Sequence, residues 1–200
     1  MSELYIGMMS GTSLDGVDAV LARFDAEGRP ELLAEHALPY PDEVKAEVLA
    51  LQPRGDDELH RSARLANRLA EIYARAAAEL LSRSGHAPAD IRAIACHGQT
   101  IRHAPHAGYT IQLGNMSRLA ELSGIDVIAD FRSRDVAAGG HGAPLVPAFQ
   151  QCVFSSERER RVILNIGGIS NLARLHPGRE AIGFDCGPGN MLMDAWCLRH

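Results

Sequence analysis

A short polar turn near the N-terminus carries the first residues that could do chemistry. The segment Ser10–Gly16, SGTSLDG, places two glycines, three hydroxyls and a carboxylate between two apolar segments. Glycines let an anion approach the backbone closely, and successive amides in such a turn form a concave set of N–H donors. This chemistry suits a phosphate group. The same residues would also form an ordinary glycine hairpin at the end of a sheet, and the turn alone does not distinguish the two.

A second stretch repeats this plan in the C-terminal part of the chain. The apolar segments Val162–Ile166 and Leu172–Leu175 flank a turn with the sequence GGISN. Two hairpins of one plan indicate an internal duplication, and we expect the two turns to hold one polyphosphate from opposite sides. The residues expected to contribute are Gly11, Thr12, Ser13 and Gly16 from the first turn and Gly167, Gly168 and Ser170 from the second.

Polar side chains also gather where two predicted buried strands end. His97 and Gln99 follow the apolar run IRAIAC, while Asp130 and Arg132 follow the run DVIA. In α/β sheets ligands bind at the carboxyl ends of strands, and a planar guanidinium suits a carboxylate. Gln112 and Asn115 at a third strand end, and Arg134, add to this group, so a ligand is expected at these strand ends. The alternative for each is a structural role, because polar groups at strand ends often cap neighbouring backbone.

The histidines and cysteines lack the spacing of a metal site. His97, His103 and His106 follow the pattern H-x5-H-x2-H, which matches no common zinc motif. The four cysteines, at positions 96, 152, 186 and 197, include no CxxC pair, so neither a disulfide nor a cysteine zinc site is expected. We expect all four thiols to be buried, with no catalytic role for Cys186. A reducing cytosol fits this usage of cysteine best.

Hydrophobic periodicity predicts an α/β fold that positions these residues. Strands are expected over 4–9, 17–24, 30–38, 91–96, 109–113, 126–130, 162–166, 172–175 and 181–185. Helices are expected over 42–51, 56–84, 115–123 and 145–154, with a last one opening at Met191. The apolar stripe of the long helix consists of Leu59, Ala63, Ala66, Leu69, Tyr73, Ala76 and Leu80. We expect this helix to be scaffold, and the glycine-rich segment 136–147 to be a hinge, a substrate loop or a plain connection.

Length and charge bound the class of protein. The 200 residues, 46% of them hydrophobic, allow one large domain or two small ones, and we expect a first lobe over 1–155 and the start of a second over 156–200. A net charge of −5 and a pI of about 6.0 argue against nucleic acid or an anionic membrane as the main partner. No apolar run approaches the ~20 residues of a membrane span, and the N-terminus shows no signal peptide. The choice between a monomer and a homodimer stays open.

Five motifs make the chain similar to the anhydro-N-acetylmuramic acid kinases of bacterial cell-wall recycling. They are GMMSGTSLDGVD (7–18), CHGQTIRH (96–103), ADFRSRDVAAGGHGAPLVPAF (129–149), LNIGGISN (164–171) and GFDCGPGN (183–190), in the order of that family. The resemblance implies an actin-like, two-lobed sugar-kinase fold, a cytoplasmic enzyme, and ATP and Mg²⁺ as cofactors. The reaction would hydrolyse the 1,6-anhydro ring of anhydro-N-acetylmuramic acid and phosphorylate O6, giving N-acetylmuramic acid 6-phosphate.

The resemblance also assigns roles to individual residues. Asp185 matches the catalytic aspartate, and its alternative role is to cap the helix that follows. A carboxylate at a strand end can take the proton from the water that attacks the anomeric carbon. The candidates for holding the sugar or its lactyl carboxylate are His97, Gln99, Asp130 and Arg132, since a planar guanidinium suits a carboxylate. Asp15 or Asp18 would hold magnesium through water. The segment that binds the ATP phosphates is matched by Ser10, Gly11, Thr12, Ser13, Leu14, Asp15, Gly16 and Val17.

Members of this family are much longer than 200 residues. If these residues are the whole polypeptide, most of the second lobe is missing and we expect little or no kinase turnover. Two alternatives to the kinase therefore stay open. One is a non-catalytic lobe that binds sugar or phosphate, and the other is an actin-like kinase that acts on another small sugar.

Overall fold

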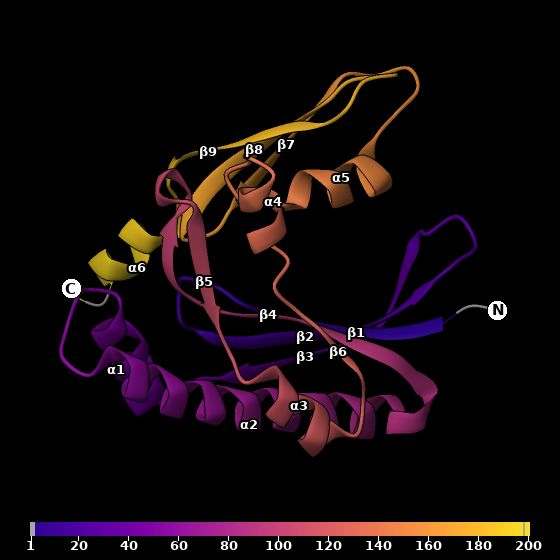
Figure 1. Cartoon of the computed structure of the whole chain (residues 1–200). Coiled ribbons are helices and arrows are strands. Elements are labelled where there is room, and N and C mark those ends of the chain that lie inside the picture. The colour runs from indigo at the N-terminus through magenta and orange to yellow at the C-terminus, as the bar shows by residue number, and fades with distance from the viewer. Residues whose placement is uncertain (1–2, 198) are drawn as a thin grey trace. The chain divides into compact units, whose positions relative to one another are not determined.

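The computed structural model describes residues 3–197 and 199–200, and the chain divides into two compact units, Met1–Ser133 and Arg134–His200. Within the described residues, the first unit holds a six-stranded sheet and the second a three-stranded one (Figure 1). The predicted α/β class is confirmed. The division falls earlier in the chain than the predicted lobe boundary, because α5 (Val146–Phe154) packs against the second sheet.

The sheet of the first unit is mixed. Its strands are β1 (Glu3–Ser10), β2 (Gly16–Phe24), β3 (Pro30–Pro39), β4 (Ile91–Ala104), β5 (Tyr109–Leu113) and β6 (Val127–Ile128). Their order is β3-β2-β1-β4-β5, with β6 paired to β4. Since β1 is antiparallel to β2 and parallel to β4, the turn that follows β1 lies beside the middle of β4. The sheet thereby brings together two polar segments that are far apart in the sequence.

The core of the first unit lies between this sheet and its helices, which are α1 (Asp42–Leu51), α2 (Glu58–Ser84) and α3 (Met116–Ser123). Figure 1 shows α2 lying along one face of the sheet, with α3 beside it. On β2, Val17, Ala19 and Leu21 are buried on the helix side, while the alternate residues face the other way. From α2, Leu69 and Leu80 are fully buried. The long helix is the scaffold that its periodicity predicts.

Three details of this unit differ from the prediction. Leu59 is 87% exposed, because it lies in the first turn of α2, ahead of the residues that meet the sheet from Leu65 onward. β4 does not end at Cys96 but continues to Ala104, because its second half pairs with β5. The strand expected over 126–130 is reduced to the two residues of β6, which pair with Ile94 and Ala95.

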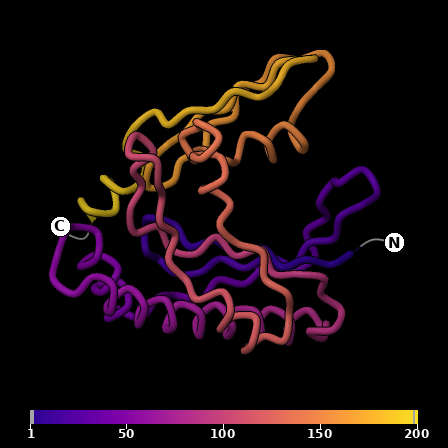
Figure 2. The backbone as a smooth tube through the Cα atoms, viewed as in Figure 1, coloured from indigo at the N-terminus to yellow at the C-terminus, as the bar shows by residue number. Residues whose placement is uncertain are grey.

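The second unit is built on three antiparallel strands in the order β7-β8-β9, namely β7 (Arg161–Ile166), β8 (Ile169–Leu175) and β9 (Ile182–Pro188). These strands run side by side in Figure 2 and are followed by α6 (Asn190–Cys197). α5 covers one face of the sheet, where Ala173 and Leu175 are buried. A short helix that the sequence analysis missed, α4 (Ser133–Ala137), precedes α5. The carboxylate of Asp135 accepts a hydrogen bond of 2.6 Å from the amide of Gly142 and so folds the glycine-rich segment back on itself.

The environment of the cysteines corrects another expectation. Cys96 is buried in the first unit, and burial raises the pKa of its thiol to about 12. Cys152, Cys186 and Cys197 are exposed rather than buried, because α5, the edge strand β9 and α6 each present one side outward from the second unit. Among the described residues, no helix is both long enough and apolar enough to cross a membrane.

Candidate functional site

The first glycine turn is anchored by a buried leucine and presents hydroxyls to the outside. Leu14 is 5% exposed and adopts a left-handed backbone conformation, with φ of 60°. Its amide donates to the carbonyl of Gly11 at 3.3 Å, which closes the turn. Thr12 and Ser13 are exposed. A Cβ added at Gly11 would meet nothing closer than the Ser13 Oγ, at 3.6 Å. The tip of the turn is therefore open to a ligand, as phosphate binding requires.

Other residues of the predicted phosphate segment have a place in the fold itself. Val17 is 1% exposed and belongs to the core. A Cβ at Gly16 would overlap the backbone of β3 at Leu38, so strand packing accounts for that glycine. The Ser10 Oγ is buried and lies 3.0 Å from the Tyr73 hydroxyl and 2.9 Å from the Gly98 carbonyl. Contact of these positions with a phosphate stays a prediction.

Two carboxylates flank the open tip of the turn. Asp15 is exposed, and its backbone carbonyl accepts a 3.1 Å hydrogen bond from the amide of Tyr40. Asp18 is exposed on β2, on the side of the sheet opposite the core residues Val17 and Ala19. Either carboxylate could hold a hydrated cation. Among the residues that the structure describes, no three histidine, cysteine or carboxylate side chains converge on a metal-binding point.

A β-bulge in β4 brings His97 and Gln99 next to this turn. Met8 pairs with Cys96 and Ser10 pairs with Gln99, so two residues of β4 stand opposite one residue of β1. Gly98 makes the bulge possible, because it adopts φ of +74° and a Cβ there would lie 2.8 Å from the carbonyl of Leu113. Bulges are common beside active sites, where they re-aim side chains.

His97 orients Arg132. The Arg132 Nε–H donates to His97 Nε2 at 2.8 Å, and His97 Nδ1 lies 2.7 Å from the Gly98 carbonyl, which can only accept. The ring is therefore neutral, with its hydrogen on Nδ1. Burial, and after it the positive charge of Arg132, lowers the pKa of His97. Two of the four predicted substrate residues are thus in contact with each other, and their contact with a sugar stays a prediction.

The other two substrate candidates are placed differently. Gln99 is fully buried and donates from Nε2 to the Gly11 carbonyl at 3.1 Å, so it supports the turn from inside. Its Oε1 has no hydrogen-bond partner among the described residues. Asp130 is exposed and adopts a left-handed conformation with φ of 58°, directly before the Phe131–Arg132 segment. Contact of either residue with a sugar stays a prediction.

The second glycine turn is held by the start of α6. The carbonyl of Gly167 accepts a 2.8 Å hydrogen bond from the amide of Asn190, and that of Gly168 accepts one of 2.9 Å from Gly189. A Cβ at Gly189 would lie 2.6 Å from the Ser170 Oγ, so the glycine allows this close approach. The two glycine turns belong to different units, and their joint action on one polyphosphate stays a prediction.

Asp185 is exposed on β9 and lies in a row of polar residues across the second sheet. Its cross-strand partner is Asn171 on β8, which in turn pairs with Asn165 on β7. The Oδ1 atoms of Asn171 and Asn190 are buried and have no hydrogen-bond partner in the described part of the chain. These asparagines were not predicted as site residues from the sequence. The two-residue period of a strand is the signal that could have indicated Asn171, because it places this residue on the same face as Ala173. A carboxylate with amides beside it is suited to hold and deprotonate a water molecule.

By fold, the chain is an α/β protein with glycine turns after the first strand of both sheets. The sequence model of the anhydro-N-acetylmuramic acid kinase family matches residues 3–200, and the chain belongs to that family.

Two curated relatives carry the name anhydro-N-acetylmuramic acid kinase. The one from Chromobacterium violaceum is 80% identical over 200 residues, and one from Neisseria gonorrhoeae is 59% identical over 201 residues. In both comparisons the match covers 100% of this chain and 54% of the relative, so the chain spans about half the length of the curated relatives it matches. Among solved structures, the Aquifex aeolicus member of the Ppx/GppA family overlaps 98% of this chain and 54% of its own, with 11% identity and a TM-score of 0.43.

Proposed function

We propose that the complete gene product is a cytoplasmic, ATP-dependent kinase with an actin-like, two-lobed fold that acts in cell-wall recycling. It would open the 1,6-anhydro ring of anhydro-N-acetylmuramic acid and phosphorylate O6. The observation that carries this proposal is the family match over residues 3–200, together with a relative of that name at 80% identity. The substrate is thus a small sugar, and neither nucleic acid nor a membrane is needed as a partner.

The first glycine turn supports the nucleotide part of the proposal. Its open tip, with exposed hydroxyls on Thr12 and Ser13 and no side chain at Gly11, fits the phosphates of ATP. Asp15 and Asp18 fit a magnesium ion that keeps most of its water, because Mg²⁺ is usually bound through one or two carboxylates and the substrate phosphates. When bound, MgATP supplies the γ-phosphoryl group and neutralises its charge.

Arg132 and Asp130 support the sugar part of the proposal. The guanidinium of Arg132 is oriented by the neutral His97 and suits the lactyl carboxylate of the sugar. Asp130, exposed two residues earlier in the chain, can accept hydrogen bonds from sugar hydroxyls. In this assignment His97 also fixes the arginine and Gln99 also fixes the glycine turn, and contact of these two side chains with the sugar remains part of the proposal.

Asp185 is the proposed catalytic base. It would take a proton from water while the water oxygen bonds to the anomeric carbon and the bond from that carbon to O6 breaks. The electron pair that stays on O6 makes it the nucleophile toward the γ-phosphorus, and ADP leaves. A positioned base typically contributes ~10²–10⁴-fold to such a step. The exposure of Asp185 beside Asn171 supports this role, since water and sugar need access to the carboxylate.

The test is ADP release by the complete gene product in the presence of the anhydro-sugar. Asp185→Asn should lower the rate by at least about 10²-fold, whereas Asp194→Asn, a matched change at another exposed carboxylate on α6, should leave it unchanged. Equal rates for the two variants would contradict the proposed base. Binding of sugar or nucleotide without ADP release would instead indicate a non-catalytic binding lobe. Release with a different sugar only would indicate another kinase of the same fold.

A further inference from the structure

A continuous run of hydrogen bonds connects the end of β1 with Arg132, entirely within the first unit. The Ser10 hydroxyl donates its only hydrogen to the Gly98 carbonyl at 2.9 Å, because a carbonyl can only accept. The same carbonyl accepts the His97 Nδ1–H at 2.7 Å, and His97 Nε2 accepts the Arg132 Nε–H at 2.8 Å. Three hydrogen bonds thus separate the first residue of the phosphate segment from the arginine.

The buried side of this connection is fixed by two tyrosines. Since the Ser10 hydrogen is used on Gly98, the Tyr73 hydroxyl must donate to Ser10 Oγ at 3.0 Å. The Tyr40 hydroxyl lies 3.3 Å from that of Tyr73 and completes the run. All three residues are at most 3% exposed, and burial raises the pKa of both tyrosines, so they stay protonated donors. Ser10 is therefore held from the core and has no hydrogen left for a phosphate.

The β-bulge explains why the Gly98 carbonyl serves two donors. In a regular parallel pair this carbonyl would bond to the neighbouring strand, but two residues of β4 stand opposite Met9 alone. The carbonyl is thereby released from the ladder and is shared by Ser10 and His97. A second link runs beside it, because Gln99 Nε2 donates to the carbonyl of Gly11.

We infer that Ser10 is a positioning residue, which fixes His97 and through it Arg132 by way of the Gly98 carbonyl, rather than a residue that binds the phosphate itself. This inference rests on the proposed function, in which the adjacent turn holds the nucleotide and Arg132 holds the sugar carboxylate.

The experiment compares two serines of the same segment in the complete gene product. Ser10→Ala removes a buried hydroxyl, and Ser13→Ala removes an exposed one three residues later. Calorimetry would measure the affinities for the anhydro-sugar and for the β,γ-methylene analogue of ATP with Mg²⁺. Ser10→Ala should weaken sugar binding about tenfold, which is the size expected when Arg132 loses one hydrogen bond to the sugar carboxylate. Nucleotide binding should weaken by less than about twofold. Ser13→Ala should show the opposite pattern.

A third variant and a ligand-free measurement separate positioning from simple loss of stability. Tyr73→Phe removes a hydroxyl of equal burial but leaves the Ser10–Gly98 bond, so it should lower the midpoint of thermal unfolding while sugar affinity stays within about twofold of the wild type. In ¹⁵N NMR of the ligand-free protein, Ser10→Ala should raise the pKa of the His97 ring, because the Gly98 carbonyl then bonds to His97 alone.

The outcomes decide the positioning role and the proposed function separately. An unchanged His97 titration in Ser10→Ala would overturn the role of Ser10, and so would equal losses of sugar affinity in Ser10→Ala and Tyr73→Phe. If the wild type binds neither ligand, the proposed function fails, and the ligand-free titration alone then confirms or overturns the link from Ser10 to His97.

Discussion

Gly11 and Gly16 of the first turn differ in the space around their Cα atoms. A Cβ at Gly16 would overlap backbone atoms of Leu38 and Pro39, whereas a Cβ at Gly11 would make only ordinary contacts with Ser13. Gly16→Ala should therefore destabilise the fold by about 1–3 kcal/mol, the usual cost of overpacking. Gly11→Ala should leave the unfolding midpoint close to that of the wild type and weaken ATP binding about tenfold or more, because the methyl group would occupy the side where a phosphate approaches. Sugar affinity should change far less.

The two alanine variants are each other's control in calorimetry and thermal unfolding. Equal losses of ATP and sugar affinity in a folded Gly11→Ala protein would mean that the turn is structural. An unaltered midpoint in Gly16→Ala would contradict the packing of that glycine against β3.

The lowered pKa of His97 leads us to expect that the stability of the fold depends on pH. Its pKa is lowered in the folded state by burial and by the charge of Arg132, whereas the unfolded histidine titrates near ~6.5. As the pH falls below ~6.5 the unfolded state therefore takes up a proton first, and stability declines until the pH passes the lower pKa of the folded state. The midpoint of thermal unfolding between pH 8 and pH 5 measures this decline. It should be smaller in His97→Asn, which keeps a donor but does not titrate, and equal slopes would contradict the assignment.

The sequence placed His97 and Gln99 at one strand end, but it did not predict their contacts with Arg132 and Gly11. In a regular strand residues 97 and 99 share one face, and both were predicted to contact substrate. The bulge at Gly98 breaks this alternation, so that Gln99 enters the core and reaches Gly11. The glycine at position 98 is a local sign of a bulge, but the geometry of the bulge also depends on the closeness of Leu113 from β5. The pairing of His97 with Arg132 likewise depends on a contact between residues 35 positions apart.

Elements with a strong period were predicted well, and elements whose extent depends on a neighbour were not. α1 and β5 have the predicted bounds, and α2 begins two residues later than expected. β4 was cut short at Cys96, because the following HGQT segment is polar and contains a glycine. Only the pairing with β5 keeps it extended to Ala104. α4 is too short, at five residues, to show a helical period.

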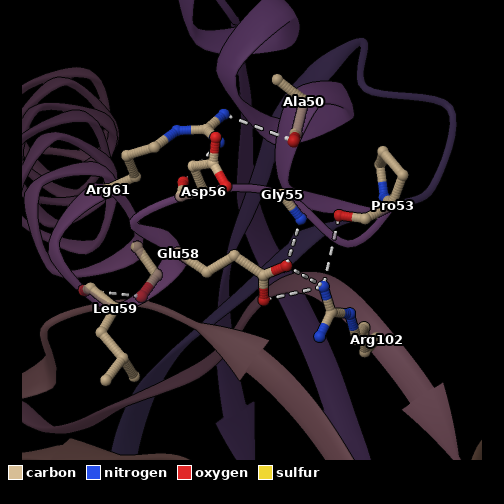
Figure 3. Close-up of polar contacts among 9 residues, drawn as sticks. Ala50, Pro53, Gly55, Asp56, Glu58, Leu59, Arg61 and Arg102 are labelled. Carbon is tan, nitrogen blue, oxygen red and sulfur yellow. Dashed lines mark hydrogen bonds and ion pairs between the residues drawn. The ribbon is translucent and has the colours of Figure 1, made fainter.

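The extension of β4 carries an ion pair that ties it to the start of α2. Arg102 Nη2 lies 2.9 Å from both carboxylate oxygens of Glu58 and 3.3 Å from the carbonyl of Pro53, and the amide of Gly55 also donates to Glu58 (Figure 3). The hydrogen bond from Arg102, and after it the one from Gly55, lowers the pKa of Glu58. One side chain thus joins the α1–α2 loop, the helix start and the strand.

Glu58→Gln should lower the midpoint of thermal unfolding by a few degrees at pH 7. A lowered carboxyl pKa contributes stability that is present above the unfolded pKa of ~4.3 and is lost as the pH falls through the folded value. The difference between wild type and variant should therefore shrink below about pH 4. Glu71→Gln, which breaks the ion pair of 2.7 Å with Arg118 on α3, is a matched control elsewhere on the same helix. A Glu58→Gln deficit that persists unchanged at low pH would contradict the role of this charge.

At the scale of the whole chain, the internal duplication predicted from two glycine turns has a counterpart in topology. β1, β2 and β3 follow one another as antiparallel neighbours in the first sheet, and β7, β8 and β9 do so in the second. The sequence could indicate this only through the turns, since the two sets of strands share antiparallel pairing but neither residues nor burial. The two units differ in the helices that pack on their sheets. In the first unit α1, α2 and α3 pack around the core, whereas in the second α5 packs against one face of the sheet.

Exposed apolar residues on β7 and β9 lead to a prediction about the association of the 200-residue chain. Val162, Leu164 and Ile166 alternate along β7 and are 66%, 55% and 59% exposed, with Ile182 and Phe184 of β9 at 50% and 53%. A contiguous apolar patch on an open sheet favours association. Changing Val162, Leu164 and Ile166 to Thr should reduce binding of the dye ANS about two-fold or more and raise the soluble fraction, because β-branched Thr keeps the strand while removing apolar surface.

The matched control changes three other exposed leucines to Thr: Leu32, Leu49 and Leu59. They are 60%, 54% and 87% exposed, and each lies on a different element, β3, α1 or α2. Isolated exposed apolar residues are ordinary on protein surfaces, so this triple variant should bind ANS like the wild type. If the two triple variants behave alike, total apolar exposure decides the behaviour of the chain and the β7–β9 face is not a special surface. If only the β7 variant changes, the exposed apolar residues of the second sheet account for the association of this chain.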